Sequence, residues 1–147
     1  MKIYRKVSGF LIRFTTLSKA ELLVYRTPTR TLRFPGGNVD AEEDLLRALQ
    51  RELYEEAGSN KFRVLRKLGI HTYYKPDVWK HVERHDYLLL SMRTLPDRFP
   101  IQGQGNDAGL VFDYFWISPE DLVQLDWEFK EPITPEYIPE LFNRPGT

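Results

Sequence analysis

Short stretches rich in apolar, β-branched and aromatic residues recur along the chain, separated by polar residues, glycines and prolines. This pattern is typical of β-strands joined by turns. It predicts strands over residues 2–15, 21–26, 31–34, 62–74, 86–93 and 111–117. The polar stretch over residues 95–109 contains several glycines, and we expect it to form a loop.

One segment follows a helical period instead. In residues 40–57, apolar residues recur at spacings of three and four and form one face of a helix: Leu45, Leu46, Leu49, Leu53 and Ala57. Asp40 is expected to cap the start of this helix, with Glu43 as its capping-box partner. Gly58 suits the position just after the last turn. The sequence therefore predicts one long helix among the strands.

Shorter helices are predicted toward the end of the chain. Ser118 followed by Pro119 is typical of a helix start, and we expect a short helix over residues 119–125. A further single turn is expected near residues 139–142. Strands dominate, and they do not alternate regularly with helices. The predicted fold class is α/β in the broad sense (α+β), as a three-layer α/β/α sandwich with a mixed β-sheet.

Length, charge and composition narrow the classes of function. The chain has 147 residues, which favours a single domain over residues 1–147. Its formal net charge is zero, so we expect no binding of long nucleic acid through bulk charge. The absence of Cys excludes disulfides, thiolate metal sites and cysteine nucleophiles. Residues 1–10 are too polar for a signal peptide, and no apolar run reaches transmembrane length. We therefore expect a cytoplasmic protein without membrane contact.

The helix over residues 40–57 gathers carboxylates on one face. At about 100° per residue, Glu55 and Glu56 lie roughly 60° and 40° to either side of Glu52. Like charges at these spacings destabilise a helix, and the neighbouring base, Arg51, is expected to lie off this face. Converging carboxylates suit a hard divalent cation, Mg²⁺ or Mn²⁺, which takes oxygen ligands and is often completed by substrate phosphate. The alternative is an acidic face that is simply solvated.

The spacing of these acids has a known form. From Gly37 the sequence reads G-x5-E-x7-R-E-L-x-E-E-x-G-S and ends at Ser59. It resembles the Nudix box, the signature of the Nudix hydrolases, at every position except the last. There the family has an aliphatic residue, and this chain has Ser59. The segment over residues 113–122 is similar to the late strand, Trp and following helix of many Nudix domains.

The resemblance implies a hydrolase that cleaves a pyrophosphate bond in a nucleoside diphosphate linked to another moiety. Its cofactor would be Mg²⁺, with Mn²⁺ as the alternative. Glu55 and Glu56 would be the main metal ligands, and Glu52 a further ligand or the base for the attacking water. The backbone carbonyl of Gly36 is another metal candidate, and Arg51 would hold Glu52 in position. Structural roles within the box would fall to Gly37, Glu43 and Gly58.

Further candidates lie outside the box. Asp113 and Asp107 are the candidates for an additional metal ligand, with an ordinary loop or strand-end carboxylate as the alternative. Cationic side chains bind phosphates and aromatic rings stack on bases. On that ground the candidates for substrate contacts are Arg33, Tyr74, Trp79 and His85, each with a packing or surface role as the alternative.

The box does not select one substrate. Nucleoside triphosphates or dinucleoside polyphosphates are favoured, with nucleotide sugars as the alternative and RNA ends as a third enzyme option. The alternative outside the enzymes is a non-catalytic module that binds or senses a nucleotide. Such modules usually lose acids of the box, whereas Glu52, Glu55 and Glu56 are all present here. Homodimers are common among proteins with this box, so a homodimer is a further expectation.

Overall fold

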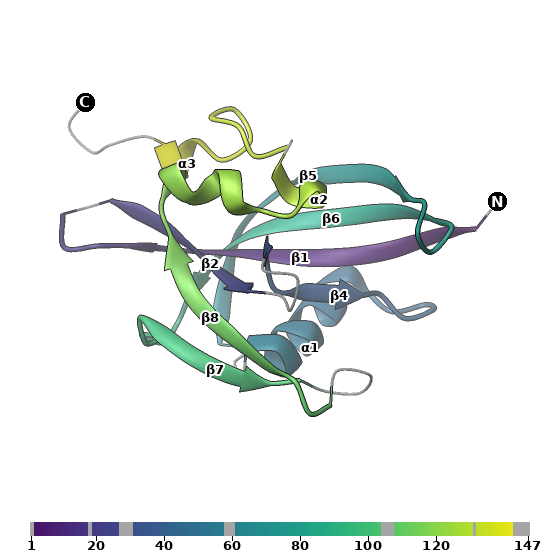
Figure 1. The fold of residues 1–147 in the computed structure, drawn as a ribbon, viewed down its shortest axis with the longest axis horizontal. Helices are drawn as coiled ribbons and strands as arrows, with labels where there is room; N and C mark the ends of the chain where they lie inside the picture. Colours follow the sequence, from purple (N-terminus) through teal and green to yellow (C-terminus); the bar gives the residue numbers. More distant parts are fainter. Residues whose placement is uncertain are drawn as a thin grey trace.

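A mixed β-sheet forms the centre of the protein in a computed structural model (Figure 1). The structure describes residues 2–17, 19–26, 31–57, 61–103, 108–130 and 132–142, without the side chains of residues 56 and 57. The strands are β1 (Ile3–Phe14), β2 (Ala20–Arg26), β3 (Leu32–Arg33), β4 (Gly36–Asn38), β5 (Phe62–Lys75), β6 (Lys80–Ser91), β7 (Arg98–Gln102) and β8 (Val111–Ile117). The helices are α1 (Leu45–Ala57), the 3₁₀ helix η2 (Pro119–Gln124), α2 (Trp127–Lys130) and α3 (Pro139–Phe142).

The strand order places β1 in the middle of the sheet. The order is β5-β6-β1-β2-β8-β7, with β3 paired to β2 and β4 paired to β1. β1 and β6 run parallel, and the other pairs are antiparallel. Along one edge, β1 pairs first with β4 and then with β2, so β4 lies beside the first half of β1.

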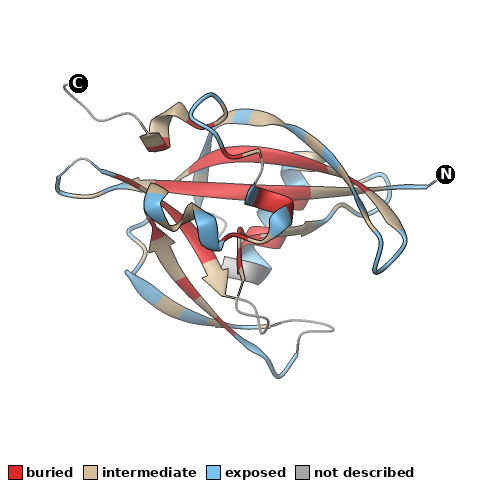
Figure 2. Cartoon of the chain, turned by 45° about the horizontal axis from the view of Figure 1, so that its top comes forward, coloured by how far each residue is buried: buried red, intermediate tan, exposed pale blue. Residues whose placement is uncertain are grey.

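The two faces of β1 belong to two different cores. Phe10 and Ile12 pack into the layer that contains η2, α2 and α3, whereas Val7 and Leu11 pack on the side of α1. Figure 2 shows that β1 and β6 are buried along much of their length. The predicted three-layer α/β/α sandwich with a mixed sheet is therefore confirmed. Among the described helices, none is long and apolar enough to cross a membrane.

All six predicted strands are present, and five of them differ from the prediction at their ends. β8 has the predicted bounds, whereas β6 begins at Lys80 and not at Asp86, because it pairs with both β1 and β5 from its first residues. β4 and β7 were not predicted. β4 contains two glycines, and β7 contains Pro100, and both residue types are depleted in strands. β7 lies at the end of the strand order, where a proline is tolerated.

The start of the long helix also differs from the prediction. α1 begins at Leu45, five residues after the predicted cap at Asp40, and Glu42 before it has a φ of 64°. Asp44 caps the helix, because its Oδ2 accepts a hydrogen bond from the backbone of Arg47 at 3.3 Å. Asp40 N–H still donates to Glu43 Oε1 at 2.9 Å, but this contact closes a turn in front of the helix.

α1 packs on the sheet through a narrower apolar face than predicted. Leu49 and Leu53 are fully buried, whereas Leu46 is 43% exposed. Gly9 of β1 makes the close approach possible, since a Cβ there would lie 2.9 Å from Leu89 and 3.2 Å from Leu53. This packing fixes the direction of the opposite, acidic side of α1. The shorter elements fit the predictions in part: α3 has the predicted bounds, η2 is a 3₁₀ helix, and α2 was not predicted.

Candidate functional site

Arg51 of α1 is the centre of a group of acidic side chains from α1 and from the turn before it. Its guanidinium donates to both carboxylate oxygens of Glu43, at 3.0 and 2.8 Å, and to Glu52 Oε1 at 2.8 Å. It also donates to the carbonyl oxygen of Asn38 at 3.0 Å. The pKa of Glu43 is lowered to about 2, mainly by hydrogen bonding from Arg51. Arg51 thus fastens α1 both to the preceding turn and to the end of β4.

Glu52 lies against the backbone of β4. It is only 8% exposed, and a Cβ on Gly37 would lie 2.2 Å from its Oε2. A side chain at position 37 would therefore displace this carboxylate. Burial raises the pKa of Glu52, while the hydrogen bond from Arg51 acts in the opposite direction. Arg51 holds Oε1, and Oε2 has no hydrogen-bond partner among the described residues.

Glu55 lies one turn further along α1. Its Oε2 is 3.7 Å from Arg51 Nη1, and its side chain is 42% exposed. The expectation that Arg51 lies off the acidic face was wrong, because a residue four positions before Glu55 shares its side of a helix. Arg51, Glu43, Glu52 and Glu55 are called the Arg51 group below. The side chain of Glu56 lies outside the described part of the structure, as does Gly58.

The Arg51 group has the chemistry for a divalent cation. Its carboxylates outnumber its single guanidinium, and the pKa of buried Glu52 is raised, so additional positive charge would stabilise the ionised form. Within the side chains that the structure describes, no three His, Asp or Glu residues are close enough together to hold a metal ion. Glu56 is not among them. The assignment of Glu52, Glu55, Glu56 and the Gly36 carbonyl to a metal therefore stays a prediction.

Of the acids predicted outside the box, Asp113 is not brought to the Arg51 group. Arg98 Nη2 donates to Asp113 Oδ2 at 2.7 Å and lowers the pKa of Asp113. Asp113 alternates along β8 with Phe112 and Tyr114, which pack on the side of α1, so it lies on the opposite face of the strand. Asp107 lies outside the described residues.

Two of the four substrate candidates already have charged partners. Arg33 forms ion pairs with Asp126 and, at 2.8 Å, with Glu128. His85 is 5% exposed. Its Nδ1 is 2.7 Å from the ammonium of Lys67 and its Nε2 is 2.7 Å from Glu83. Because an ammonium can only donate, Nδ1 is the acceptor and Nε2 carries the proton. The structure thus gives His85 a buried, bonded role and no free ring nitrogen.

The other two candidates are aromatic residues of the β5–β6 hairpin. Trp79 is 82% exposed and has a φ of 56° in the turn of this hairpin. The ring of Tyr74 lies 4.7 Å from the ring of His81, and both line a shallow pocket of about 300 Å³ together with Ile3. These rings are accessible to a planar ligand, and their contact with a substrate stays a prediction.

A second charged region, which the sequence did not predict, lies between the sheet and α2. Glu128 is 2% exposed and accepts hydrogen bonds from Arg33 at 2.8 Å and from the hydroxyl of Tyr73 at 3.3 Å. Lys75 Nζ lies 3.1 Å from its other oxygen. Burial would raise the pKa of Glu128, but the charges and hydrogen bonds of Arg33 and Lys75 lower it to about 2. These residues are called the Glu128 group. They come from distant parts of the chain, and no sequence motif connects them.

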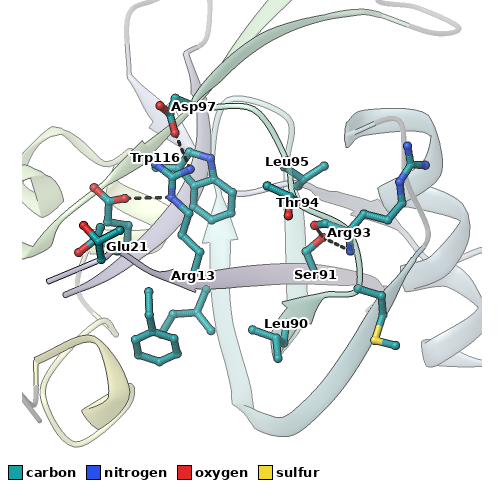
Figure 3. Close-up of a pocket in the computed structure, with 14 residues that line it drawn as sticks. Arg13, Glu21, Leu90, Ser91, Arg93, Thr94, Leu95, Asp97 and Trp116 are labelled. Carbon is teal, nitrogen blue, oxygen red and sulfur yellow. Dashed lines mark hydrogen bonds and ion pairs between the residues drawn. The ribbon is translucent and has the colours of Figure 1, made fainter. Parts of the chain in front are cut away.

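A wider pocket of about 810 Å³ lies at the far end of β1 (Figure 3). Arg13 crosses it, with ion pairs to Glu21 at 2.9 Å and to Asp97 at 2.8 Å, and its guanidinium lies 4.3 Å from the centre of the Trp116 ring. The cation is therefore already paired. None of the box residues that the structure describes lines this pocket, so it does not belong to the site around the Arg51 group.

Comparisons with known proteins agree with this geometry. The family model described as NUDIX domain matches residues 7–137. A protein of Arabidopsis thaliana, "Nudix hydrolase 26, chloroplastic", is 27% identical over 119 residues, which cover 72% of this chain and 55% of that protein. The chain thus spans about half the length of this relative.

Solved structures share the fold at low sequence identity. A NUDIX hydrolase from Nitrosomonas europaea has a TM-score of 0.64 at 17% identity, covering 95% of this chain and 88% of that one. The MutT protein from Methanosarcina mazei Go1 has a TM-score of 0.62 at 16% identity, covering 94% and 92%. An Ap4A hydrolase from C. elegans has a TM-score of 0.58 at 19% identity, covering 84% and 86%. Since the family model matches most of the chain, this protein belongs to the Nudix family.

Proposed function

We propose that this protein is a Mg²⁺-dependent hydrolase that cleaves a pyrophosphate bond in a nucleoside diphosphate linked to another moiety. Family membership supports a Nudix-type pyrophosphohydrolase. The observation that carries the proposal is the position of Glu52. Arg51 holds one of its carboxylate oxygens, and the other lies beside the backbone of Gly37 without a hydrogen-bond partner among the described residues. Carboxylate and backbone oxygens are the donors that a hard divalent cation takes.

The residues of the site would divide the work as follows. Glu55 and Glu56 would hold the cation, with the carbonyl of Gly36 as a further ligand. When bound, the cation would stabilise charge that develops on the phosphate oxygens and lower the pKa of a water molecule. Glu52 would take a proton from the attacking water or complete the ligand set. Arg51 would keep Glu52 in place, because it donates to Oε1 and not to Oε2.

The two roles of Glu52 can be separated by experiment. In the variant Glu52→Gln, we expect the rate constant to fall more than the affinity for Mg²⁺, because an amide cannot accept the proton. Mg²⁺ affinity would be measured by calorimetry and the rate constant at saturating Mg²⁺. A loss of affinity that accounts for the whole effect would make Glu52 a ligand and not the base.

For the substrate we favour nucleoside triphosphates or dinucleoside polyphosphates. Lys6, Arg33 and Arg84 line a pocket together with Gly36 and Gly37. Arg33 and Arg84 are paired with acids, and Lys6 would stabilise an additional phosphate of the chain. The C. elegans protein with a similar fold is named an Ap4A hydrolase. The substrate proposed for this chain rests on its cationic residues and not on that name. Nucleotide sugars are the second candidate. A cytoplasmic location, a homodimer and the absence of long nucleic acid stay untested proposals.

A panel of substrates tests the proposed function. Purified protein would be incubated with nucleoside triphosphates, dinucleoside polyphosphates and nucleotide sugars, with Mg²⁺ or with EDTA, and the products identified by mass. We expect hydrolysis of a polyphosphate class only with Mg²⁺. Hydrolysis that continues in EDTA would contradict the proposed chemistry. If nothing is cleaved and a nucleotide still binds, the protein is a sensor and not an enzyme.

A further inference from the structure

A small basic pocket lies on the face of the sheet opposite α1. Its volume is about 110 Å³. The charged side chains that line it are Lys6 of β1, Arg33 of β3 and Arg84 of β6, and Gly36 and Gly37 of β4 form part of its wall. We call it the Lys6 pocket. Among the described residues that line it there is no acid, so the lining carries a positive charge.

The two arginines of the pocket are already paired with acids that do not line it. Arg33 Nη2 lies 2.8 Å from Glu128, and Arg84 Nε lies 2.7 Å from Asp86. Lys6 differs from both arginines. Within the described part of the chain, its ammonium takes part in no hydrogen bond and no ion pair. Lys6 is therefore a cation of the pocket for which the described residues supply no partner.

The surroundings of Lys6 are unfavourable for an unpaired cation. Lys6 is half-buried, and its burial together with the nearby charges of Lys75 and Arg33 lowers the pKa of its ammonium to about 8. Glu128 acts in the opposite direction but is bound to other cations. An anion in the pocket would offset this cost. Lys6 is also paired in register with Arg84 of β6, so the two cationic residues share one face of the sheet.

The size and position of the pocket indicate which anion it takes. Pockets that enclose drug-sized ligands usually measure about 300–1,000 Å³, so 110 Å³ suits a single phosphate group and not a nucleoside. Gly37 borders both sites, since it lines the Lys6 pocket and a Cβ on it would lie 2.2 Å from Oε2 of Glu52. β4 is short and pairs only with β1 among the described strands, so no neighbouring strand covers its other edge.

We propose that the Lys6 pocket binds a phosphate group of the substrate that is not attacked, on the opposite side of β4 from the Arg51 group. This inference rests on the proposed function, because it assumes a polyphosphate substrate. A chain with three or more phosphates would place one phosphate at the acidic face and another at Lys6. The pocket would thus select polyphosphates over nucleotide sugars, in which a neutral sugar follows the second phosphate.

Binding of inorganic pyrophosphate without metal tests the pocket directly. The affinity would be measured by calorimetry in EDTA at pH 7 for the wild type and for Lys6→Met, Lys6→Arg and the control Lys19→Met. Lys19 is exposed and lies at the other end of β1, so its removal changes the net charge equally. We expect Lys6→Met to weaken binding by on the order of tenfold and Lys6→Arg to retain most of it. Equal affinities in Lys6→Met and the wild type would overturn the proposal, as would no binding to the wild type.

The fold of the variant and the proposed function are checked separately. Met can fill the half-buried position of Lys6 without a charge, so thermal unfolding of Lys6→Met should occur at or above the wild-type temperature. If the protein hydrolyses no nucleotide but binds pyrophosphate through Lys6, the proposed function is contradicted and the proposal for the Lys6 pocket stands. If the wild type hydrolyses nucleotides and Lys6→Met has the same KM, the proposed function stands and the proposal for the Lys6 pocket is contradicted.

Discussion

The two charged regions of this protein are built in opposite ways. In the Arg51 group one guanidinium is shared by three carboxylates, and in the Glu128 group one carboxylate is shared by two cations, Arg33 and Lys75. The side chain of Arg51 is 31% exposed, whereas that of Glu128 is 2% exposed. The Arg51 group thus carries surplus negative charge that reaches the surface at Glu55, whereas Glu128 is buried between the sheet and α2, where Arg33 also pairs with Asp126.

The difference in burial indicates a difference in role. A charge without water around it must be paired within the protein, and removing its partner is costly. A charge at the surface can be screened by water or by a bound ion. We therefore expect substitutions in the Arg51 group to change activity more than stability. Substitutions in the Glu128 group should change stability more than metal binding.

The largest effect is expected for Glu56→Gln, with Glu55→Gln as a second variant. Loss of a metal carboxylate should lower turnover by about a hundredfold or more, because the developing phosphate charge loses its counterion. Steady-state hydrolysis at saturating substrate measures this. Glu136→Gln is the control, since Glu136 is exposed and lies outside both regions. Wild-type turnover in Glu56→Gln would show that the carboxylates of the box have another role here.

Glu128→Gln should have the largest effect on stability. It leaves Lys75 without its counter-charge among the described residues and leaves Arg33 with Asp126 alone, and loss of one member of a buried ion pair costs about 3–5 kcal/mol. Urea unfolding at pH 7 would measure the change in the free energy of unfolding, again with Glu136→Gln as control. Mg²⁺ affinity should stay within about twofold of wild type. A stability change as small as that of the control would contradict the role assigned to this group.

Acid should remove the contribution of Glu128 in a defined range of pH. Its pKa in the folded protein is lowered to about 2, against an ordinary value of 4.5. A lowered pKa stabilises the fold above pH 4.5, and this stabilisation is lost as the pH falls from there toward 2. Thermal unfolding between pH 3 and 7 should therefore show a smaller decrease in Glu128→Gln than in the wild type. Parallel curves for the two proteins would contradict the pairing.

Arg51→Lys should have an intermediate effect on turnover. An ammonium cannot reproduce the fork that binds Glu43 with two donors while a third donor holds Glu52. We expect turnover to fall roughly tenfold, while Mg²⁺ affinity changes little, because the carboxylates are still present. The midpoint of thermal unfolding serves as the control for folding. If the loss of folded protein accounts for the whole fall in turnover, Arg51 has no positioning role.

Asp113→Asn is expected to have the smallest effect. The ion pair of Asp113 with Arg98 is exposed, and such pairs contribute little to stability. Because Asp113 faces away from α1, turnover and its dependence on Mg²⁺ should stay close to wild type. A loss of Mg²⁺ affinity comparable to that in Glu55→Gln would instead indicate that Asp113 is a metal ligand.

The parts of the fold that could be predicted depend on neighbours in the sequence. The strands β1, β2 and β8 and most of α1 follow from local periodicity, and the Arg51 group lies within one short segment. The Glu128 group could not be predicted, because Arg33, Lys75 and Glu128 meet only after β3, β5 and α2 have packed together. β4 has no strand propensity of its own and forms because β1 offers it a partner.

The central claim is that the acidic face of α1 binds a divalent cation. Titration of Mn²⁺ into the nucleotide-free protein, followed by electron paramagnetic resonance, tests it most directly for the wild type, Glu56→Gln, Glu55→Gln and the control Glu136→Gln. We predict that the wild type and the control bind Mn²⁺ with the same affinity and that both box variants bind it at least tenfold more weakly. Equal binding by all four proteins, or no binding by any of them, would contradict the account.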